Sequence, residues 1–294
     1  MPMLHPQVQQ VINLFLLLVL GKSFSEIYLS WSYITIILLW ALLLEHGMLF
    51  IKENKLSFFS FSSLSTAIGV MLMLATPHSY IYIIVLGLGL FQKHFLTIEE
   101  RHFFNPSNFA LLTALLLFYD DSHIVLGQLG DSLGLKIFVV ILAVSILIRV
   151  SRWAIPITFI LVYIVMQYLF IVQYDPVLII DDVYDRFYSV SFIVFILFML
   201  TDPKTTPKDV WAQVGFSVVL VFVVTILDYV YGFRVQHLFM ALFMLSIVVP
   251  FYSVWKKNIN HLRFFIITVM LLFLALGAII YIETKPPYYF EMNG

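Results

Sequence analysis

Cysteine and charge are both scarce in this 294-residue chain. There is no cysteine, which excludes disulfides, thiolate metal sites, Cys-ligated iron–sulfur clusters and a cysteine nucleophile. Charged residues occupy only 11% of positions, against about 25% in a soluble domain. No Lys/Arg run is long enough for nucleic acid, and no GxGxxG, Walker, HExxH or GxSxG motif is present. Catalytic residues are therefore unknown, and whether the protein is an enzyme stays open.

Apolar residues take the place of the missing charge. They make up 62% of the chain, and the mean hydropathy is +1.01. Such a chain cannot cover itself with enough polar surface for water, and its apolar runs recur from one end to the other. The sequence predicts an all-α polytopic membrane protein. The first run follows neither a basic region nor a cleavage site, so we expect it to belong to the mature structure.

Eleven apolar segments can be delimited. They are residues 8–22, 29–51, 62–76, 78–95, 106–119, 133–151, 153–173, 188–201, 210–231, 235–254 and 262–282. Three of them, 62–76, 106–119 and 188–201, would reach only ~20 Å as helices, about two thirds of a ~30 Å hydrocarbon core. Short segments flanked by Pro and Asn indicate broken or half-spanning helices, whose ends must be covered by protein or a polar cavity.

The distribution of basic residues supports this count. If every segment crosses the membrane, the side of the N-terminus collects eleven of the 16 Lys and Arg residues, and the other side collects five. Basic residues concentrate in cytoplasmic loops. We therefore expect a cytoplasmic N-terminus and an extracytoplasmic C-terminus.

The chain also contains an internal repeat. Residues 62–77 resemble 188–203, and residues 107–118 resemble 236–248, with both offsets near 127–130. Each offset spans five segments, so the second copy would be inverted in the membrane. We expect a first five-helix repeat at 1–125, an inverted repeat at 126–255, and an additional helix with a short outer tail at 256–294.

A first polar motif abuts the short segment at 106–119. Asn105 and Pro106 form a helix start, with Asn as the N-cap and Pro at the first helical position. The neighbouring Ser107, Asn108 and Phe109 complete the motif, and its counterpart in the inverted repeat would be Arg234, Gln236 and His237. Two such helix starts pointing at the midplane could bind an anion, a carbonyl or a phosphate-like group. Equally, they could simply cap helices at the interface.

A second polar motif follows the segment at 188–201. It contains Thr201, Asp202, Pro203, Thr205 and Pro207, which stop a helix sharply or could line a central cavity. The hydroxyl residues Ser63, Ser65 and Thr66 head another short segment, where they could pack helices together or line a solute path. No metal site is predicted from these patterns.

The two polar motifs carry a resemblance to a known family. "KHFLTIEERHFFNPSNF" resembles the KHIFNPxNF segment of the RnfD/NqrB membrane proteins, and "FMLTDPKTTP" resembles their FMxTDPxTxP block. The start of the chain is most similar to the stand-alone UnbU-like, or RnfD-like, branch. The likeness covers most of residues 5–255.

The resemblance implies a fold of two inverted five-helix repeats, like that of urea transporters, in a bacterial cytoplasmic (inner) membrane. It implies that the two motifs shape helix breaks around a central cavity. RnfD and NqrB are subunits of electron-transport complexes and carry FMN on a Thr of an SGAT-type motif. The corresponding loop here, "YDDSHIVLGQLGDSLG", has no Thr, so covalent FMN is not expected.

Three functions follow as hypotheses. The first is an RnfD-like subunit of a redox assembly, holding a non-covalent flavin, a quinone or a partner in its cavity. The second is a transporter or channel for a small neutral or anionic solute. The third is a membrane anchor for an extracytoplasmic partner. The expected partners are the lipid bilayer and other membrane or extracytoplasmic subunits, without nucleic acid.

Overall fold

The computed structural model describes residues 6–24, 27, 29–54, 60–98, 101–125, 133–173, 180–255 and 261–285. Over these residues the chain is all-α apart from two pairs of two-residue strands. The loop predicted to lack a flavin Thr lies partly outside the described residues, as does the C-terminal tail.

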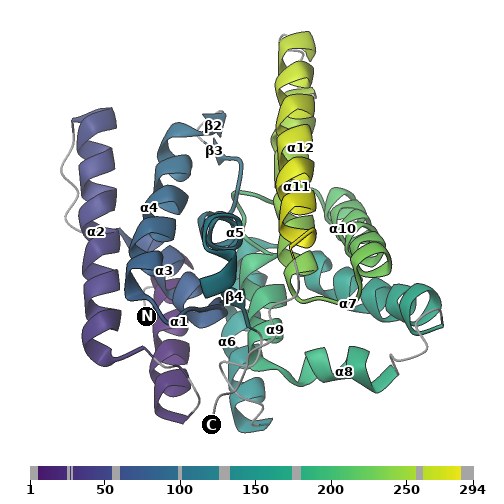
Figure 1. Ribbon diagram of the computed structural model, residues 1–294, viewed down its shortest axis with the longest axis horizontal. Coiled ribbons are helices and arrows are strands. Elements are labelled where there is room, and N and C mark those ends of the chain that lie inside the picture. Colours follow the sequence, from purple (N-terminus) through teal and green to yellow (C-terminus); the bar gives the residue numbers. More distant parts are fainter. Residues whose placement is uncertain are drawn as a thin grey trace.

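Twelve α-helices are found in the described part of the chain (Figure 1). They are α1 Pro6–Phe24, α2 Trp31–Glu53, α3 Phe61–Met73, α4 Ser79–Phe95, α5 Pro106–Leu117, α6 Leu133–Val150, α7 Ala154–Gln167, α8 Ile180–Tyr188, α9 Val190–Val194, α10 Val210–Tyr231, α11 Gln236–Trp255 and α12 His261–Glu283. Each of the eleven predicted segments corresponds to a helix, within a few residues at either end. The exception to the prediction is α8, a short amphipathic helix in a stretch that the sequence analysis assigned to no segment.

Among the residues that the structure describes, four helices are long and apolar enough to cross a membrane, which indicates a multi-pass membrane protein. They are Trp31–Glu53, Ala154–Val172, Val210–Tyr231 and Arg263–Glu283. The second of these continues α7 through the π-helical turn η2, Tyr168–Val172. Shorter apolar helices include α3, α5 and the stretch Val190–Met199, in agreement with the three short segments predicted from the sequence.

Each short helix has an identifiable end. α3 stops at Leu74, where the chain becomes extended as β1, Leu74–Ala75, and pairs antiparallel with β4, His123–Ile124. Asn105 caps the start of α5 through its side chain. Between them lie β2, Thr97–Ile98, and β3, Arg101–His102, which form a small hairpin. α9 passes into the π-helical turn η3, Phe195–Met199, before the Thr201–Pro207 motif ends it.

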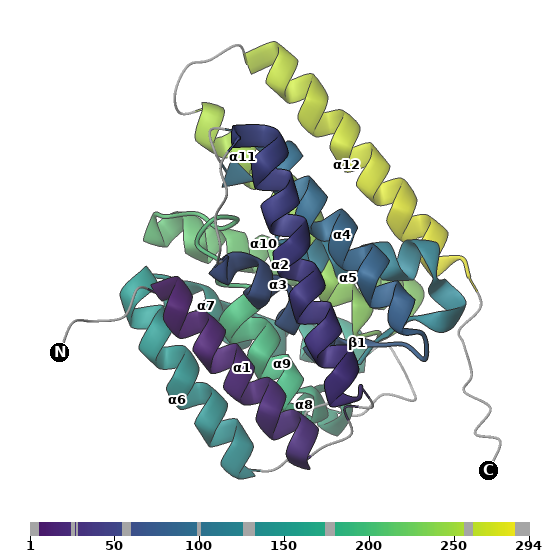
Figure 2. The ribbon, with the colours of Figure 1, turned by 90° about the vertical axis from the view of Figure 1, so that its left-hand side faces the viewer.

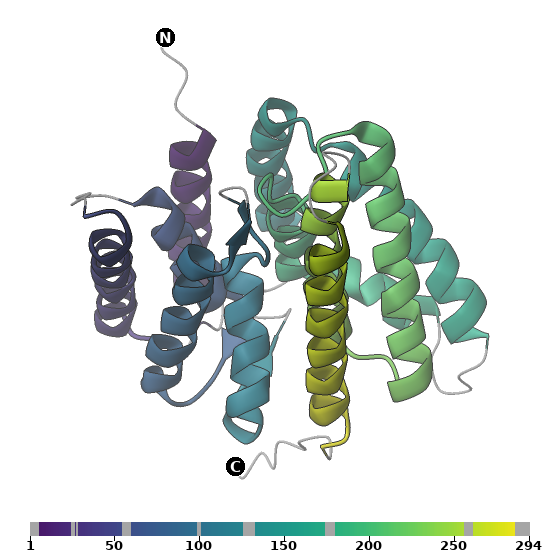
Figure 3. The same ribbon diagram turned by 90° about the horizontal axis from the view of Figure 1, so that it is seen from above.

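The helices pack in two groups. α1 lies against α3, and α4 lies against α2 and α5; in the other group α6 lies against α9, and α10 against α7 and α11. Seen from above, helices of the first group (purple to blue) lie on one side and those of the second (teal to green) on the other (Figure 3). The groups meet where α1 contacts α6, as Figure 2 shows, and where α5 contacts α11. α12 packs on α11 and α5.

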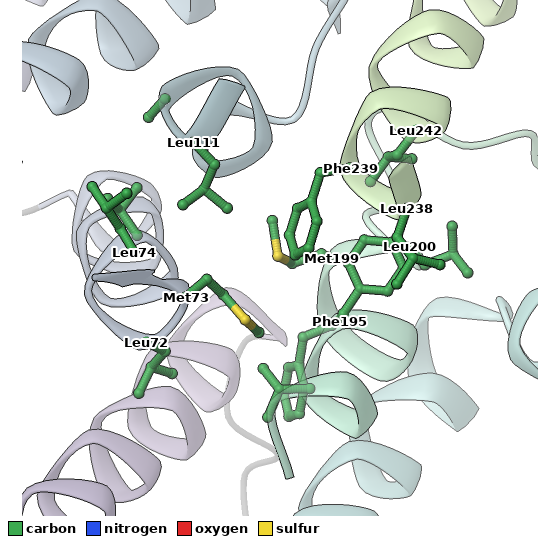
Figure 4. Close-up of a cluster of buried hydrophobic side chains, with 14 of the residues drawn as sticks. Leu72, Met73, Leu74, Leu111, Phe195, Met199, Leu200, Leu238, Phe239 and Leu242 are labelled. Atoms are coloured by element: carbon green, nitrogen blue, oxygen red, sulfur yellow. The ribbon is translucent and has the colours of Figure 1, made fainter. Parts of the chain in front are cut away.

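An apolar cluster fills the space where the two groups meet. Side chains from α3, β1 and α5 face side chains from η3 and α11 (Figure 4). The labelled members are Leu72, Met73, Leu74, Leu111, Phe195, Met199, Leu200, Leu238, Phe239 and Leu242. Nearly all are fully buried. Because such a cluster excludes water, it separates polar sites on either side of it.

Candidate functional site

A cavity of about 100 Å³ lies between the two groups of helices. One buried water needs roughly 10–15 Å³ of such space, so the cavity is large enough for several waters or a small solute. Its wall is formed by Gln7, Gln10, Leu14, Phe61, Ser62, Ser65, Thr66, Gly69, Met73, His102, Asn105, Pro106, Ser107, Val194, Phe198, Met199, Asp202, Pro203 and Lys204. The FNPSNF and TDPKTTP motifs, about 100 residues apart in sequence, therefore contribute to one site.

A direct hydrogen bond joins the two motifs. The Asn105 Nδ2 donates to Asp202 Oδ2 at 3.2 Å, while Asn105 Oδ1 accepts the backbone N–H groups of Ser107 and Asn108 at 3.0 and 3.1 Å. Asp202 Oδ1 in turn accepts the N–H of Lys204 at 3.0 Å. Asn105 thus caps α5 and ties it to the end of η3 with the same side chain.

The remaining residues of the first motif hold α5 in place. Ser107 donates its hydroxyl to the Thr66 carbonyl at 3.2 Å, which joins α5 to α3. Asn108 is fully buried and donates to the Phe239 carbonyl at 3.1 Å, across the interface between the groups. Phe109 does not belong to the cavity wall; its ring packs against those of Phe104 and Phe243, with centroids 5.4 and 6.0 Å away.

Two glycines allow this close packing. A Cβ on Gly89 of α4 would lie 2.7 Å from the Pro106 carbonyl oxygen, and one on Gly69 of α3 would lie 2.8 Å from Ser107 Oγ. At Gly89 the neighbour is backbone that cannot move aside, so α4 approaches the start of α5 this closely only because the position is glycine. At Gly69 the neighbour is the Ser107 hydroxyl, which would have to shift to admit a Cβ. Neither glycine belongs to a motif that is visible in the sequence.

The second motif forms the turn that was expected. Thr201 donates to the Leu197 carbonyl at 2.7 Å, and the Thr205 N–H donates to the Asp202 carbonyl at 3.2 Å. The buried Arg152 Nε donates to Thr206 Oγ1 at 3.1 Å and fastens the turn to the start of α7. Pro207 lies at the exit of the turn, half-buried. Of this motif, Asp202 and Pro203 reach the cavity wall.

Some hydroxyl residues of α3 line the cavity, and one packs inside the protein. Ser65 and Thr66 line the cavity, together with Ser62. Ser63 instead donates its hydroxyl to the Ser60 carbonyl at 3.0 Å and is fully buried. For Ser63 the packing interpretation fits the contacts better than the cavity interpretation.

His102 contributes a neutral polar group to the wall. Burial lowers the pKa of its imidazole, although the carboxylate of Asp202 acts in the opposite direction. Its Nδ1 lies 2.8 Å from the Phe104 carbonyl, which assigns the proton to Nδ1 and leaves Nε2 as an acceptor. With Asp202 and Lys204 of opposite charge, the charged groups on the wall balance.

The residues predicted as the second-repeat counterpart lie apart from this cavity. His237, Gln236 and Arg234 form a separate cluster with the carboxylates of Asp228 and Glu283. In the sequence, Asp228 stands near the end of the apolar segment 210–231, where an interfacial position would be expected. The structure shows both carboxylates almost completely buried.

A third polar group, whose partners the sequence does not identify, joins α2 to α4. Glu45 is 4% exposed, and its carboxylate lies 2.6 Å from Lys93 Nζ and 2.9 Å from His94 Nε2. Ser60 donates to the same carboxylate at 3.1 Å. The only available signal was the coincidence of Glu45 and Lys93 at the predicted cytoplasmic ends of neighbouring segments.

No protein-family model matches the chain, and no curated protein matches it. In the described residues no group of three or more His, Asp or Glu side chains is placed to hold a metal ion.

Proposed function

We propose that the protein is a multi-pass membrane transporter or channel for a small neutral polar solute, which binds in the cavity between the two groups of helices. One observation carries the proposal: a cavity between the two groups receives polar side chains from both, Asn105 and Ser107 from one group and Asp202 from the other, and it ends against buried apolar side chains. Ligand sites of transporters lie between structural repeats, at broken helices.

The wall chemistry selects the class of solute. An anion would need free N–H groups at the start of α5, but the Asn105 side chain already accepts those of Ser107 and Asn108. Asp202 and Lys204 on the wall carry opposite charges, so the wall offers no net positive charge to an anion. Hydroxyl, amide and neutral imidazole groups donate and accept hydrogen bonds to an uncharged solute.

The cavity is closed at one end in this conformation. Met73 and Met199 line it and also belong to the apolar cluster of Figure 4. Flexible methionine side chains fill irregular gaps and repack readily. We infer that passage requires this cluster to open.

The packing pattern supports two inverted repeats with boundaries near residues 125 and 255. The contacts of α1 with α3, and of α4 with α2 and α5, have parallels in α6 with α9, and α10 with α7 and α11. Asn108 and Phe239, which touch across the interface, are 131 positions apart, close to the repeat offset. α12 is then the appended helix, and the basic-residue count favours a cytoplasmic N-terminus. The resemblance to the RnfD/NqrB proteins implies a bacterial inner membrane.

A second candidate is an RnfD-like subunit of a redox assembly with a non-covalent flavin or quinone. The Asn105–Asp202 hydrogen bond supports it, because the resemblance implies that these two motifs surround one cavity. The third, an anchor for an extracytoplasmic subunit, has no specific support in the geometry.

Proteoliposome flux separates these functions. The proteoliposomes would be shifted to higher osmolarity with urea, glycerol or nitrate as the probe. Light scattering would record their shrinkage and the return of volume as the probe enters. We expect urea or glycerol to cross faster than in protein-free liposomes, and nitrate not to. Ser65→Leu, which fills the cavity, should abolish the increase, whereas Ser32→Leu on an exposed position of α2 should retain it.

Equal rates with and without protein for all three probes would refute transport of this class. A yellow preparation with flavin absorption, or co-purification with redox subunits, would favour the second candidate. A colourless protein that co-purifies with an extracytoplasmic protein and carries no flux would favour the anchor.

A further inference from the structure

A buried ionic cluster lies at the junction of α10, α11 and α12, away from the proposed solute cavity. Its central residue is His237, which is completely buried on the first turn of α11. Asp228 of α10 is 2% exposed and Glu283 of α12 is 7% exposed. Ionisable groups buried in membrane helices are costly and usually carry a function.

The fixed charges of the cluster cancel. Arg234 Nη1 lies 2.8 Å from Glu283 Oε2, and Arg186 Nη1 lies 3.9 Å from Asp228 Oδ2. Arg186 also stacks over the ring of Phe233 at 3.4 Å. Arginine stays protonated at every relevant pH. Two cations therefore face two carboxylates, and the charge of the cluster depends on the His237 proton.

The imidazole is placed between both carboxylates. Its Nδ1 lies 2.6 Å from Asp228 Oδ1, and its Nε2 lies 3.3 Å from Glu283 Oε1. A neutral imidazole carries one N–H, so one of its nitrogens would direct a lone pair at a carboxylate oxygen. Only the protonated ring offers a proton to both Asp228 and Glu283.

Other titratable groups around the cluster do not compete for this proton. Tyr231 lies beside His237, with ring centroids 6.4 Å apart, and Tyr163 accepts a hydrogen bond from Arg186. Lys285, just beyond α12, lies 5.3 Å from the ring of Tyr119. Tyrosine and lysine titrate well above neutral pH. Near neutral pH, the exchangeable proton belongs to His237 and its two carboxylates.

The cluster is mechanically connected to the closed end of the cavity. Leu238 and Phe239 follow His237 directly, and both contribute side chains to the apolar cluster of Figure 4. The Phe239 carbonyl accepts the hydrogen bond from Asn108, one residue beyond the cavity-lining Ser107. A displacement of the first turn of α11 would therefore move the side chains that close the cavity.

We propose that His237, Asp228 and Glu283 bind one exchangeable proton, and that its release loosens the first turn of α11 and favours opening of the cavity. The proton holds α10, α11 and α12 together through contacts to both carboxylates. The effect on opening rests on the proposed transport function, whereas proton binding at the cluster does not.

Thermal unfolding in detergent tests proton binding by itself. A proton bound in the folded state stabilises it at low pH, and this stabilisation is lost as pH rises. We expect the difference in thermal midpoint between the wild type and His237→Gln to shrink from about pH 6 to about pH 9. A difference that is constant over this range would overturn the proposal.

Two further variants provide the controls. In Glu283→Gln, an amide replaces the carboxylate and can donate a hydrogen bond to the unprotonated Nε2 of His237. The thermal midpoint of this variant should therefore lose the pH dependence that comes from His237. Arg234, with 29% of its side chain exposed, can turn to water when its carboxylate partner is removed. His78→Gln removes a matched but exposed pair, since His78 Nε2 lies 3.8 Å from Asp121 Oδ1 on the surface. It should keep the wild-type pH dependence, and loss of that dependence in His78→Gln would contradict the assignment.

Urea flux in proteoliposomes tests the opening. Wild-type permeability should rise by up to about tenfold per pH unit over the range in which the proton is lost, and His237→Gln should be fast and independent of pH. Flux that is independent of pH in the wild type would refute the link to opening. Absence of any flux would refute the transport function instead, while the unfolding data would still decide proton binding.

Discussion

At the scale of single residues, Asn105 combines two tasks that are usually separate. It caps α5 and bridges to Asp202. We expect Asn105→Ala to lower the free energy of unfolding by about 1–2 kcal/mol, the usual cost of losing an N-cap. Asn105→Asp would keep the cap but place a second carboxylate beside Asp202, so it should be more harmful at neutral pH than in acid. Denaturant unfolding of both variants at neutral and acidic pH measures these effects. An equal loss of unfolding free energy in Asn105→Asp at both pH values would contradict the contact between residue 105 and Asp202.

The buried pair of Glu45 and Lys93 gives a second prediction at this scale. Removing one partner of a buried ion pair commonly costs about 3–5 kcal/mol, because the other charge remains buried. We expect Lys93→Met to approach the lower end of that range, since His94 and Ser60 still contact Glu45. The double variant Glu45→Gln/Lys93→Met should recover much of the loss, as measured by denaturant unfolding. Simple additivity of the two single changes would show that the pair is not coupled.

At the scale of helices, the close approach of α4 to α5 depends on Gly89. A methyl group there would meet the backbone oxygen of Pro106 at 2.7 Å, and backbone cannot swing aside. We expect Gly89→Ala to displace the start of α5 and to reduce both the thermal midpoint and solute flux. Gly87→Ala is the matched control on the same helix: its added methyl would lie 3.7 Å from a Leu44 methyl, an ordinary contact. A thermal midpoint and a solute flux that are unchanged in Gly89→Ala would contradict the close contact between α4 and α5.

At the scale of the whole molecule, the arrangement of the helices predicts which loops share a membrane face. Asn105 and Lys204 both line the cavity, so we expect the connection before α5 and the connection before α10 to lie on the same membrane face. Single cysteines at Asn54 and Lys208, added to a chain without its own cysteine, should react with an impermeant thiol reagent only after the cytoplasmic side is exposed. A cysteine at Asp121 should react from the outside. Labelling of 54 and 208 from opposite faces would refute the topology.

Composition and pattern determined the coarse architecture from the sequence alone. The apolar runs predicted every described helix except α8. A helix in a membrane forms its backbone hydrogen bonds within itself and needs apolar side chains, so it is visible in the sequence as an apolar run. α8 was not predicted, because it is amphipathic and acidic and so contains no apolar run. The Asn-Pro and Asp-Pro signals located the ends of α5 and η3, since capping and helix termination are local chemistry.

Only the tertiary structure decided which polar residues meet. Asn105 and Asp202 are 97 positions apart, and Gln167 and Asp228, joined at 2.8 Å, are 61 apart. Nothing local in the sequence pairs them, because their contact depends on how helices cross and how deeply each end is buried. For the same reason, the burial of Asp228 follows from its contacts with Gln167 and His237 of other helices and not from its place near the end of an apolar segment. Sequence determines where a helix can form and end, whereas the proximity of distant helices determines whether a charge meets water or a partner.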